Sequence, residues 1–147
     1  MDNKYFEMKF DAIPSNEAFA RYVVGAFMID ANPTLEELED VKTAVSEAVT
    51  NCIVHGYEDK GGVIELNCKI SNNCLIIEVK DNGVGICDID KAMEPFFTSK
   101  PSTERSGMGL PLIRSFMSSV VLNSNVGKGT TIVMTKNLSQ EEANVRA

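Results

Sequence analysis

The fold is decided by residues 64–85, which read IELNCKISNNCLIIEVKDNGVG. Apolar and polar side chains alternate over residues 64–70, a pattern typical of a strand with one buried face. The asparagine pair at 72–73 predicts a tight turn, and a second strand is expected over residues 74–80. These residues therefore predict a hairpin that leads directly into the glycine-containing loop 81–85.

Two helices are predicted upstream of this hairpin, after a first strand at residues 5–10. Residues 14–17, Pro-Ser-Asn-Glu, are typical of a helix start, and four residues at helical spacing predict the buried stripe: Phe19, Val23, Ala26 and Phe27. Thr34 and Glu37 form a capping box that begins the second helix. Its predicted apolar stripe is Leu38, Val41, Val45, Ala48, Val49 and Cys52, and Gly56 is expected to end it.

Downstream of the hairpin, the sequence predicts a helical turn at residues 89–93, a helix at 110–118 and two strands at 120–123 and 130–135. Hairpin-connected strands with helices grouped between them favour a two-layer α/β sandwich. We expect a mixed, mostly antiparallel sheet with the helices on one face.

Composition bounds the possible functions. The length of 147 residues suits a single domain, 1–147, and 14 basic against 21 acidic residues leave a net charge of −7. That charge argues against direct nucleic-acid binding, which needs a basic face. The sequence shows neither a membrane span nor a signal peptide, so a cytoplasmic protein without a membrane partner is expected. Four cysteines without a C-x-x-C pair argue against zinc, and free thiols are predicted although Cys68 and Cys74 could approach each other across the hairpin.

The carboxylate of Asp81 is a candidate ligand for a nucleobase. Alternate residues of the predicted strand share one face, and Asp81 continues the apolar face toward the helices. A buried carboxylate needs a hydrogen-bond donor, which the exocyclic amine of a base would supply, while Gly83 and Gly85 would let a flat ring approach. A turn aspartate that bonds only the following backbone amides is the alternative.

Glu47 and Asn51 lie four residues apart on the second predicted helix, so their side chains project from the same side. Both border the apolar stripe, at the edge of an expected cleft. An amide oxygen can bind Mg²⁺ and a carboxylate can take a proton from an attacking hydroxyl, which suits phosphoryl transfer. Two solvated side chains are the alternative, and His55, inside the stripe, is predicted to be packed.

Six of the ten glycines form three Gly-x-Gly pairs, at 83/85, 107/109 and 127/129. Each pair stands at the edge of a predicted element, which indicates that the backbone approaches something closely in several places, although three unrelated turns would give the same pattern.

A long loop precedes the second glycine pair. It carries several hydroxyls together with Lys100 and Arg105, and suits a cover over an anion, with an ordinary surface loop as the alternative. The loop delivers Gly107-Met108-Gly109 to the start of a helix, whose free amides attract phosphate.

Five sequence boxes occur in one order along the chain. They are Glu47-x-x-x-Asn51, Asp81-Asn82-Gly83-Val84-Gly85, Thr98-Ser99-Lys100-Pro101, Gly107-Met108-Gly109-Leu110 and Gly127-Lys128-Gly129-Thr130-Thr131. This series resembles the nucleotide site of the GHKL superfamily, which histidine kinases, gyrase-type topoisomerases and heat-shock ATPases share. The resemblance covers nearly the whole chain and implies the Bergerat fold with bound ATP and Mg²⁺.

Further stretches narrow the resemblance: Ala18-Phe19-Ala20-Arg21, Ser46-Glu47-Ala48-Val49-Thr50-Asn51, His55-Gly56-Tyr57 and Glu104-Arg105-Ser106-Gly107-Met108-Gly109. They resemble the anti-sigma F factors of endospore-forming bacteria, a family of serine kinases that also hold a sporulation sigma factor inactive. Three partners are implied: a sigma factor of the sigma F type, an anti-anti-sigma factor that is phosphorylated on serine, and a second copy of the chain in a homodimer. Arg21 would contact both protein partners.

The resemblance also implies a role for each site residue. Asp81 would receive the adenine amino group, Gly83 and Gly85 would lie beneath the ring, and Thr130 would add a contact. Asn51 would coordinate Mg²⁺, and Glu47 would be the general base. The remaining residues would bind phosphate: Thr98 within its box, Lys100 and Arg105 by their charge, and Gly107, Met108, Gly109 and Leu110 by wrapping it.

Three alternatives stay open at this point. A stress-type anti-sigma serine kinase, of the sigma B kind, carries the same boxes. A stand-alone catalytic domain like that of a histidine kinase would act on a separate acceptor. A pure binding module would hold ATP as a structural ligand, although such a module needs no base like Glu47.

Overall fold

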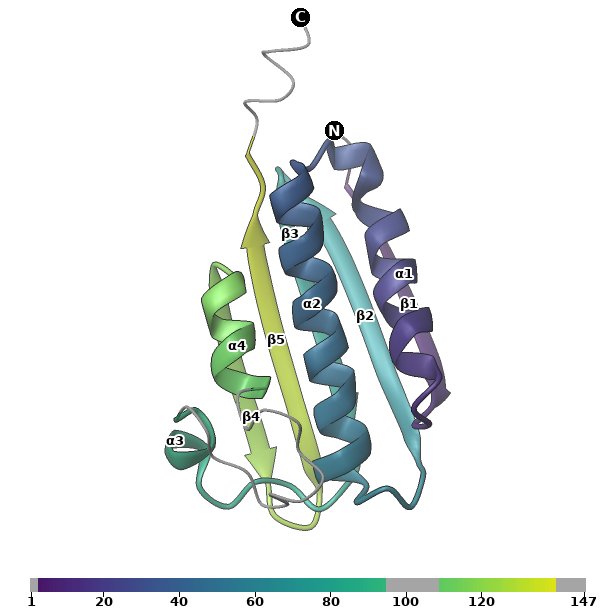
Figure 1. The fold of residues 1–147 in the computed structure, drawn as a ribbon, viewed down its shortest axis with the longest axis vertical. Helices are drawn as coiled ribbons and strands as arrows, with labels where there is room; N and C mark the ends of the chain where they lie inside the picture. Colours follow the sequence, from purple (N-terminus) through teal and green to yellow (C-terminus); the bar gives the residue numbers. More distant parts are fainter. Residues whose placement is uncertain (1–2, 95–108, 140–147) are drawn as a thin grey trace, which may run out of the picture.

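The computed structural model describes residues 3–94 and 109–139 (Figure 1). The elements follow in the order β1 (Lys4–Asp11), α1 (Asn16–Met28), a short 3₁₀ turn (Ile29–Ala31), α2 (Leu35–Asn51), a π-helical turn (Cys52–Gly56), β2 (Val63–Ser71), β3 (Cys74–Asp81), α3 (Ile89–Ala92), α4 (Gly109–Phe116), β4 (Ser119–Asn125) and β5 (Gly129–Asn137). The predicted element order is confirmed, with strand and helix ends shifted by a few residues.

The strands form one sheet in the order β1-β2-β3-β5-β4. All four neighbouring pairs among the described strands are antiparallel, so the mixed sheet that the sequence favoured is wrong in that detail. Two of these pairs, β2 with β3 and β4 with β5, are hairpins, which are antiparallel by construction. The other two, β1 with β2 and β3 with β5, join strands that helices separate in the sequence.

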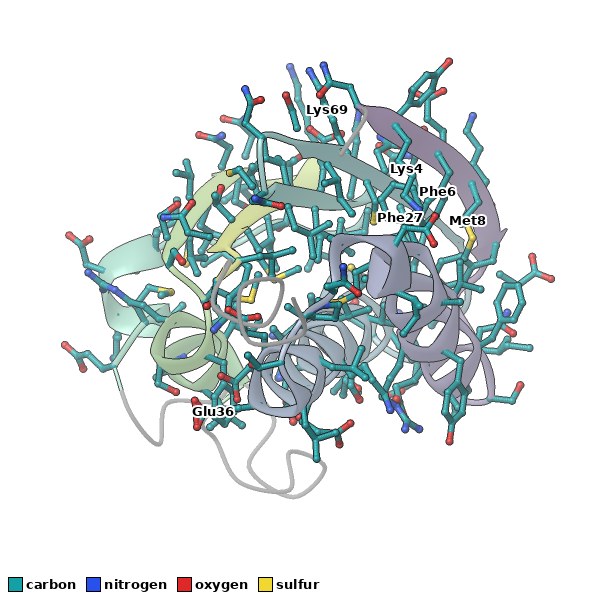
Figure 2. All side chains as sticks on the ribbon, turned by 90° about the horizontal axis from the view of Figure 1, so that it is seen from above. Lys4, Phe6, Met8, Phe27, Glu36 and Lys69 are labelled. Carbon is teal, nitrogen blue, oxygen red and sulfur yellow. The ribbon has the colours of Figure 1, made fainter. Side chains whose placement is uncertain are left out.

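The helices cover one face of the sheet, with α2 in the middle and α1 and α4 on either side (Figure 1). The two layers enclose the core, where side chains of both layers are fully buried: Met28, Val41, Val45, Ile64, Leu66, Ile70, Leu75, Ile77, Ile113 and Met134. Seen from above, the sheet and the helices form separate layers, and Lys69 extends from the open face of the sheet (Figure 2). Among the described residues, none of the helices has the length and apolar character that crossing a lipid bilayer demands.

The capping box that was predicted for the second helix is confirmed. The hydroxyl of Thr34 accepts a hydrogen bond from the Glu37 N–H at 3.0 Å, and the Glu37 carboxylate accepts one from the Thr34 N–H at 2.8 Å. The second oxygen of Glu37 accepts the N–H of Ser139 at 2.7 Å. Glu37 therefore ties the start of α2 to the chain that follows β5.

The apolar stripe predicted for α1 is wrong by one residue. The buried residues of this helix are Ala20, Val24, Gly25 and Met28, whereas Phe19 is 51% exposed. The aromatic rings pack on the edge strand instead. Phe27 packs against Phe6 with ring centroids 4.8 Å apart (Figure 2). The ring centroids of Phe19 and Phe10 are 6.4 Å apart. The buried face of α1 carries no aromatic ring, and Gly25 on this face lies close to Leu38 and Lys42 of α2.

The central hairpin turns at Asn72 and Asn73, whose φ angles of 53° and 59° lie in the left-handed region that asparagine tolerates. In this register Cys68 lies opposite Ile77 and Cys74 opposite Ser71, so the hairpin does not bring the two cysteines together. Strand β3 continues one residue beyond its predicted end and thereby includes Asp81.

Candidate functional site

Asp81 lies at the end of β3 on the face that packs against the helices, and only 3% of it is exposed. Its Oδ1 accepts a hydrogen bond from the Gly83 N–H at 2.9 Å, and Thr130 lies opposite it in the sheet. Burial raises the pKa of Asp81, while hydrogen bonds from the Gly83 N–H, the Cys52 thiol and the Thr130 N–H partly offset that rise. The predicted burial of this carboxylate is confirmed, and the turn contact that was its alternative is present as well.

The loop after Asp81 is fixed to the end of α2 by two residues. The Gly56 carbonyl accepts the Val84 N–H at 2.9 Å. The Tyr57 hydroxyl accepts the Asn82 N–H at 2.8 Å and donates to the Val63 carbonyl at 2.6 Å. These bonds hold the loop in place from the helical side without using the carboxylate.

Gly56 is a site residue to which the sequence assigned no function. A methyl group on its Cα would stand 2.7 Å from Asp81 Oδ2, and one on Gly83 would stand 2.0 Å from the Gly56 carbonyl oxygen. Both glycines are therefore required by close packing of backbone on backbone and on the carboxylate. The only signal for it in the sequence was the stretch His55-Gly56-Tyr57, a few residues after Asn51, which formed part of the family resemblance.

The π turn at the end of α2 explains how these residues reach Asp81. The Tyr57 N–H bonds the Cys52 carbonyl at 2.8 Å, five residues back, where an α-helix would bond four residues back. This wider turn places both the Cys52 thiol and the Gly56 Cα against Asp81. The apolar periodicity predicted a plain α-helix here, because one extra residue in a turn leaves no trace in a stripe of apolar residues. His55, predicted to be packed, is half-buried in this turn.

The first and third glycine pairs meet in space. The Gly127 N–H donates to the Val84 carbonyl at 2.7 Å. Gly85 has a φ of +80°, and a methyl group on it would stand 2.3 Å from the Asn125 carbonyl oxygen. The predicted close approach of backbone is thus confirmed for these two pairs, and they share one loop cluster instead of forming unrelated turns.

Glu47 and Asn51 come together with the start of α4. A methyl group on Gly109 would stand 3.1 Å from Asn51 Nδ2, 3.3 Å from Asn51 Oδ1 and 3.4 Å from Glu47 Oε2. The Asn51 Nδ2 is buried and has no hydrogen-bond partner among residues 3–94 and 109–139. A half-buried carboxamide whose nitrogen has no partner in the described part of the chain, beside a carboxylate and a helix start, suits an oxygen-rich ligand and its cation.

These two clusters use neighbouring residues of one helix. Cys52 contacts Asp81, and Asn51, one residue earlier, lies against Gly109. Successive residues of a helix project about 100° apart, so the two clusters occupy adjacent sides of the end of α2. One elongated molecule could therefore contact both, with its flat end at Asp81 and its anionic end at Asn51.

The remaining predicted site residues divide into two groups. Leu110 follows Gly109 in α4 and is 8% exposed, and Thr130, also 8% exposed, lies beside Asp81. Five others lie outside the described residues: Thr98, Lys100, Arg105, Gly107 and Met108.

Arg21 lies on α1, apart from both clusters. Its Nε donates to Glu17 Oε2 at 2.9 Å, and its guanidinium lies 4.7 Å from the ring centre of Tyr22. The same oxygen, Glu17 Oε2, accepts a hydrogen bond from the Ser46 hydroxyl, with 2.6 Å between the two oxygen atoms. Ser46 lies on α2 and directly precedes Glu47. The hydrogen bond to Glu17 raises the pKa of Arg21, so Arg21 is a permanently charged group on α1.

Comparison with known proteins agrees with this architecture. The sequence profile of the histidine kinase-like ATPase domain matches residues 10–136. The RsbU and RsbW domains of a Mycobacterium tuberculosis protein, solved by crystallography, superpose with a TM-score of 0.66 at 16% identity, over 93% of this chain and 33% of theirs. At that identity the likeness concerns the fold, and this chain spans about one third of that protein.

Several full-length relatives are much more similar in sequence. The anti-sigma F factor of Clostridium acetobutylicum is 54% identical over 92% of this chain and 94% of its own length. The anti-sigma F factors of Thermoanaerobacter pseudethanolicus and Geobacillus thermodenitrificans are 50% and 45% identical, over 92% of this chain and 95% and 94% of theirs. The chain therefore belongs to the anti-sigma F factors, a family built on the histidine kinase-like ATPase domain.

Proposed function

We propose that this protein binds ATP with Mg²⁺, phosphorylates a serine of an anti-anti-sigma factor, and as a homodimer in the cytoplasm holds a sigma factor of the sigma F type inactive. The observation that carries the catalytic part is the contact of Glu47 and Asn51 with the same residue, Gly109, at the start of α4. The family membership supports the sigma factor as the regulated partner.

Adenine would lie at Asp81. The carboxylate already accepts hydrogen bonds from Gly83, Thr130 and Cys52, and these hold it in one orientation. An exocyclic amine of the base would add a further donor to a buried acceptor, which favours the charged form. Gly83 and Gly85 would hold the loop beside the ring by close packing, since a Cβ on either would meet the backbone of Gly56 or Asn125.

Asn51 would hold the cation and the phosphates. Its carboxamide is half-buried, and its nitrogen lacks a partner in the described part of the chain, so the group is available for a ligand. Mg²⁺ prefers oxygen ligands and binds through one or two protein groups together with substrate phosphates and water. When bound, it would neutralise part of the phosphate charge.

Glu47 would act as the general base. Its Oε2 lies near Gly109 at the start of α4, and the first backbone N–H groups of a helix favour an anion. A serine hydroxyl that enters between Glu47 and the terminal phosphate would give its proton to this carboxylate as the oxygen attacks phosphorus. A module that only stored ATP would need no proton acceptor there.

The protein partners would dock on α1. Phe19 and Tyr22 are 51% and 60% exposed on α1, Ile29 directly after the helix is 53% exposed, and Arg21 adds a positive charge to α1. Exposed aromatic residues beside an arginine are typical of the residues that dominate binding at protein interfaces. The link from Arg21 through Glu17 to Ser46 connects this surface with the residue that precedes Glu47.

Incubation with γ-labelled ATP and an anti-anti-sigma factor tests the proposal. Acid-stable phosphoserine on the partner is the expected product. Acid-labile phosphate on histidine would favour the histidine-kinase alternative, and absence of transfer despite ATP binding would favour the pure binding module. Identifying the sigma subunit that co-purifies in the presence of ATP separates the sigma F type from the stress type, and the mass of the free protein in solution tests the homodimer.

The docking surface is tested separately. Arg21→Ala should weaken binding of both protein partners while ATP affinity stays unchanged, because Arg21 touches neither nucleotide cluster. Lys69→Ala is the matched control, because this substitution also removes one positive charge. Lys69 lies on the open face of the sheet, away from α1 (Figure 2). If both variants lose the same partner affinity, the loss comes from net charge alone, which would contradict docking on α1.

A further inference from the structure

Lys136 places a positive charge on the face of β5 that packs against the helices. Alternate residues of a strand share one face, and Lys136 follows Ile132 and Met134, which are buried on the helical side. Its own side chain is only 14% exposed. A charge at the margin of a core is costly to bury without partners, so the partners of Lys136 indicate its role.

Two groups on neighbouring helices accept hydrogen bonds from the Lys136 ammonium group. Phe116, the last residue of α4, accepts one through its carbonyl oxygen at 2.5 Å, and Asp40 of α2 accepts one through Oδ2 at 3.3 Å. A carbonyl at the end of a helix lacks a partner within the helix and lies at the negative end of the helix dipole. Lys136 therefore caps α4 and joins it to α2.

The residues on either side of Lys136 hold the chain that leaves α4. The Ser118 N–H donates to the Thr135 carbonyl at 2.8 Å, and the Ser118 hydroxyl accepts the Asn137 N–H at 2.9 Å. Three successive residues of β5 thus fix the end of α4, and Lys136 extends this hold to α2.

Helix α4 connects this junction with the proposed phosphate site. The two helices lie side by side (Figure 1) and run in opposite directions. Phe116, at the end of α4, shares the Lys136 ammonium group with Asp40, whereas Gly109, at its start, lies against Asn51. Asp40 and Asn51 are eleven residues apart in α2, which corresponds to about 16 Å along the helix. Two separate contacts therefore set the position of α4 along α2.

A helix as short as α4 needs such support. It has eight residues, and isolated helices shorter than about 12–15 residues are marginal in water. Because about two turns of helix move as one body, a change of tilt at Phe116 also displaces Gly109. Misplacement of a reacting group by about 1 Å can lower a rate by about 10²-fold, even when the altered residue is far from the chemistry.

We propose that Lys136 is a positioning residue of the phosphate site: by holding the end of α4 on α2, it keeps Gly109 at contact distance from Asn51 and Glu47. The inference rests on the proposed function, because it requires the phosphates of ATP at Gly109. Lys136 acts through α4 and touches no ligand itself.

The ratio of the dissociation constants for ATP and adenosine, both measured with Mg²⁺, tests this role. Adenosine carries the base without phosphates, so it reports on the cluster around Asp81, which residues of β3, β5 and the end of α2 form. In Lys136→Met, affinity for ATP should fall about tenfold, affinity for adenosine should stay constant, and phosphoryl transfer at saturating ATP should fall at least about tenfold. Lys136→Arg keeps the charge and the donors and should keep the ratio.

A second substitution separates positioning from stability. Lys136→Met leaves the Asp40 carboxylate without this partner, which lowers stability whatever the role of α4. Adding Asp40→Asn removes the unpaired charge, so the double variant should regain most of the lost urea midpoint of unfolding and still bind ATP weakly. Asp40→Asn alone leaves Lys136 bonded to the Phe116 carbonyl and should show the wild-type ratio.

Lys4→Met is the matched control. Lys4 also forms an ion pair, with Asp30 at 3.2 Å, and it lies on β1, at the opposite edge of the sheet from β4. The same substitution at this position should leave both affinities and phosphoryl transfer unchanged.

The outcomes separate the inference from the proposed function. If Asn51→Ala leaves the ratio for ATP and adenosine unchanged, the phosphates do not bind at Asn51 and the proposed phosphate site is wrong. If Asn51→Ala changes the ratio but Lys136→Met lowers both affinities equally, or changes neither, then the positioning role of Lys136 alone is overturned. Recovery of ATP affinity together with stability in the double variant would overturn it as well.

Discussion

Gly109 lies directly against the side chain of Asn51, so that a methyl group on its Cα would stand 3.1 Å from Nδ2 and 3.3 Å from Oδ1. The start of α4 and the end of α2, which are far apart in the sequence, thus share one contact point at the proposed phosphate site. Glu47 completes it, with Oε2 at 3.4 Å from the same methyl position. Glycine at position 109 therefore leaves room for a ligand between the start of α4 and the side chains of Asn51 and Glu47.

Gly109→Ala should separate stability from activity. Gly109 is the first residue of α4, where the helix preference of alanine is weaker than in the interior, so the free energy of unfolding should stay within about 1 kcal/mol of wild type. Phosphoryl transfer should fall at least tenfold, because the new methyl group presses on Asn51 and Glu47. Urea denaturation and transfer of labelled phosphate measure the two effects.

Gly25→Ala is the control for this substitution. Gly25 lies in α1, away from both clusters. A methyl group on it would meet only flexible side chains of α2, with Lys42 at 3.3 Å as the nearest. It should leave ATP binding and ATP turnover unchanged. Full transfer activity in Gly109→Ala would contradict the proposed phosphate site.

Glu47→Gln and Asp81→Asn should fail in different ways. A general base supplies about 10²–10⁴-fold of rate, so Glu47→Gln should raise the barrier to phosphoryl transfer by about 3–5 kcal/mol and leave ATP affinity nearly intact. Asp81→Asn should instead weaken ATP binding by about tenfold or more, because it leaves mismatched buried polar groups. Calorimetric titration with ATP and single-turnover transfer distinguish them, and an equal loss of ATP affinity in both variants would refute the division of roles.

ATP affinity should depend on pH through Asp81. Burial raises the native pKa of this carboxyl group, so its charged form, which accepts the adenine amine, is lost on acidification earlier than for an exposed aspartate. Affinity should therefore decline as the pH falls through this raised pKa. Titration of the ATP phosphates is common to all variants, so Asp81→Asn, which lacks the carboxyl group, serves as the reference curve.

Stability of the ligand-free protein should show the opposite trend. A native pKa above the unfolded value means that Asp81 favours folding below the ordinary aspartate range, and that this contribution is lost as the pH rises through the raised native pKa. The free energy of unfolding of wild type, measured relative to Asp81→Asn, should thus decrease with rising pH over this window. A difference that stays constant with pH would show that burial does not perturb this group.

Thr34→Ala should lower stability without touching the site. It removes the hydroxyl that accepts the Glu37 N–H at the start of α2, and loss of such a cap costs about 1 kcal/mol. The free energy of unfolding in urea measures the cost, and ATP affinity should remain that of wild type. Glu36→Ala, one residue before Glu37 and exposed, should cost markedly less.

The sequence by itself determined the layers and the end of β3. Alternation over residues 64–70 and the asparagine turn identified the hairpin, and the parity of β3 placed Asp81 on the buried face, because a strand has a period of two that no packing can change. The capping box of Thr34 and Glu37 was also readable, since all of its atoms lie within one helical turn. The spacing of Glu47 and Asn51 put both on one side of α2 for the same local reason.

Only the tertiary structure decided what these residues touch. The contact of Asn51 with Gly109, the packing of Asp81 on Gly56, and the meeting of the loops at Gly85 and Gly127 each join segments that no local period relates. The π turn brings Cys52 and Gly56 to Asp81. Its hydrogen bonds are weaker than those of an α-helix, and contacts with β3 and with the loop after it offset that loss. Which face of α1 is buried was likewise settled by packing, because the rings of Phe19 and Phe27 lie against Phe10 and Phe6 of β1 while Ala20, Val24, Gly25 and Met28 are buried.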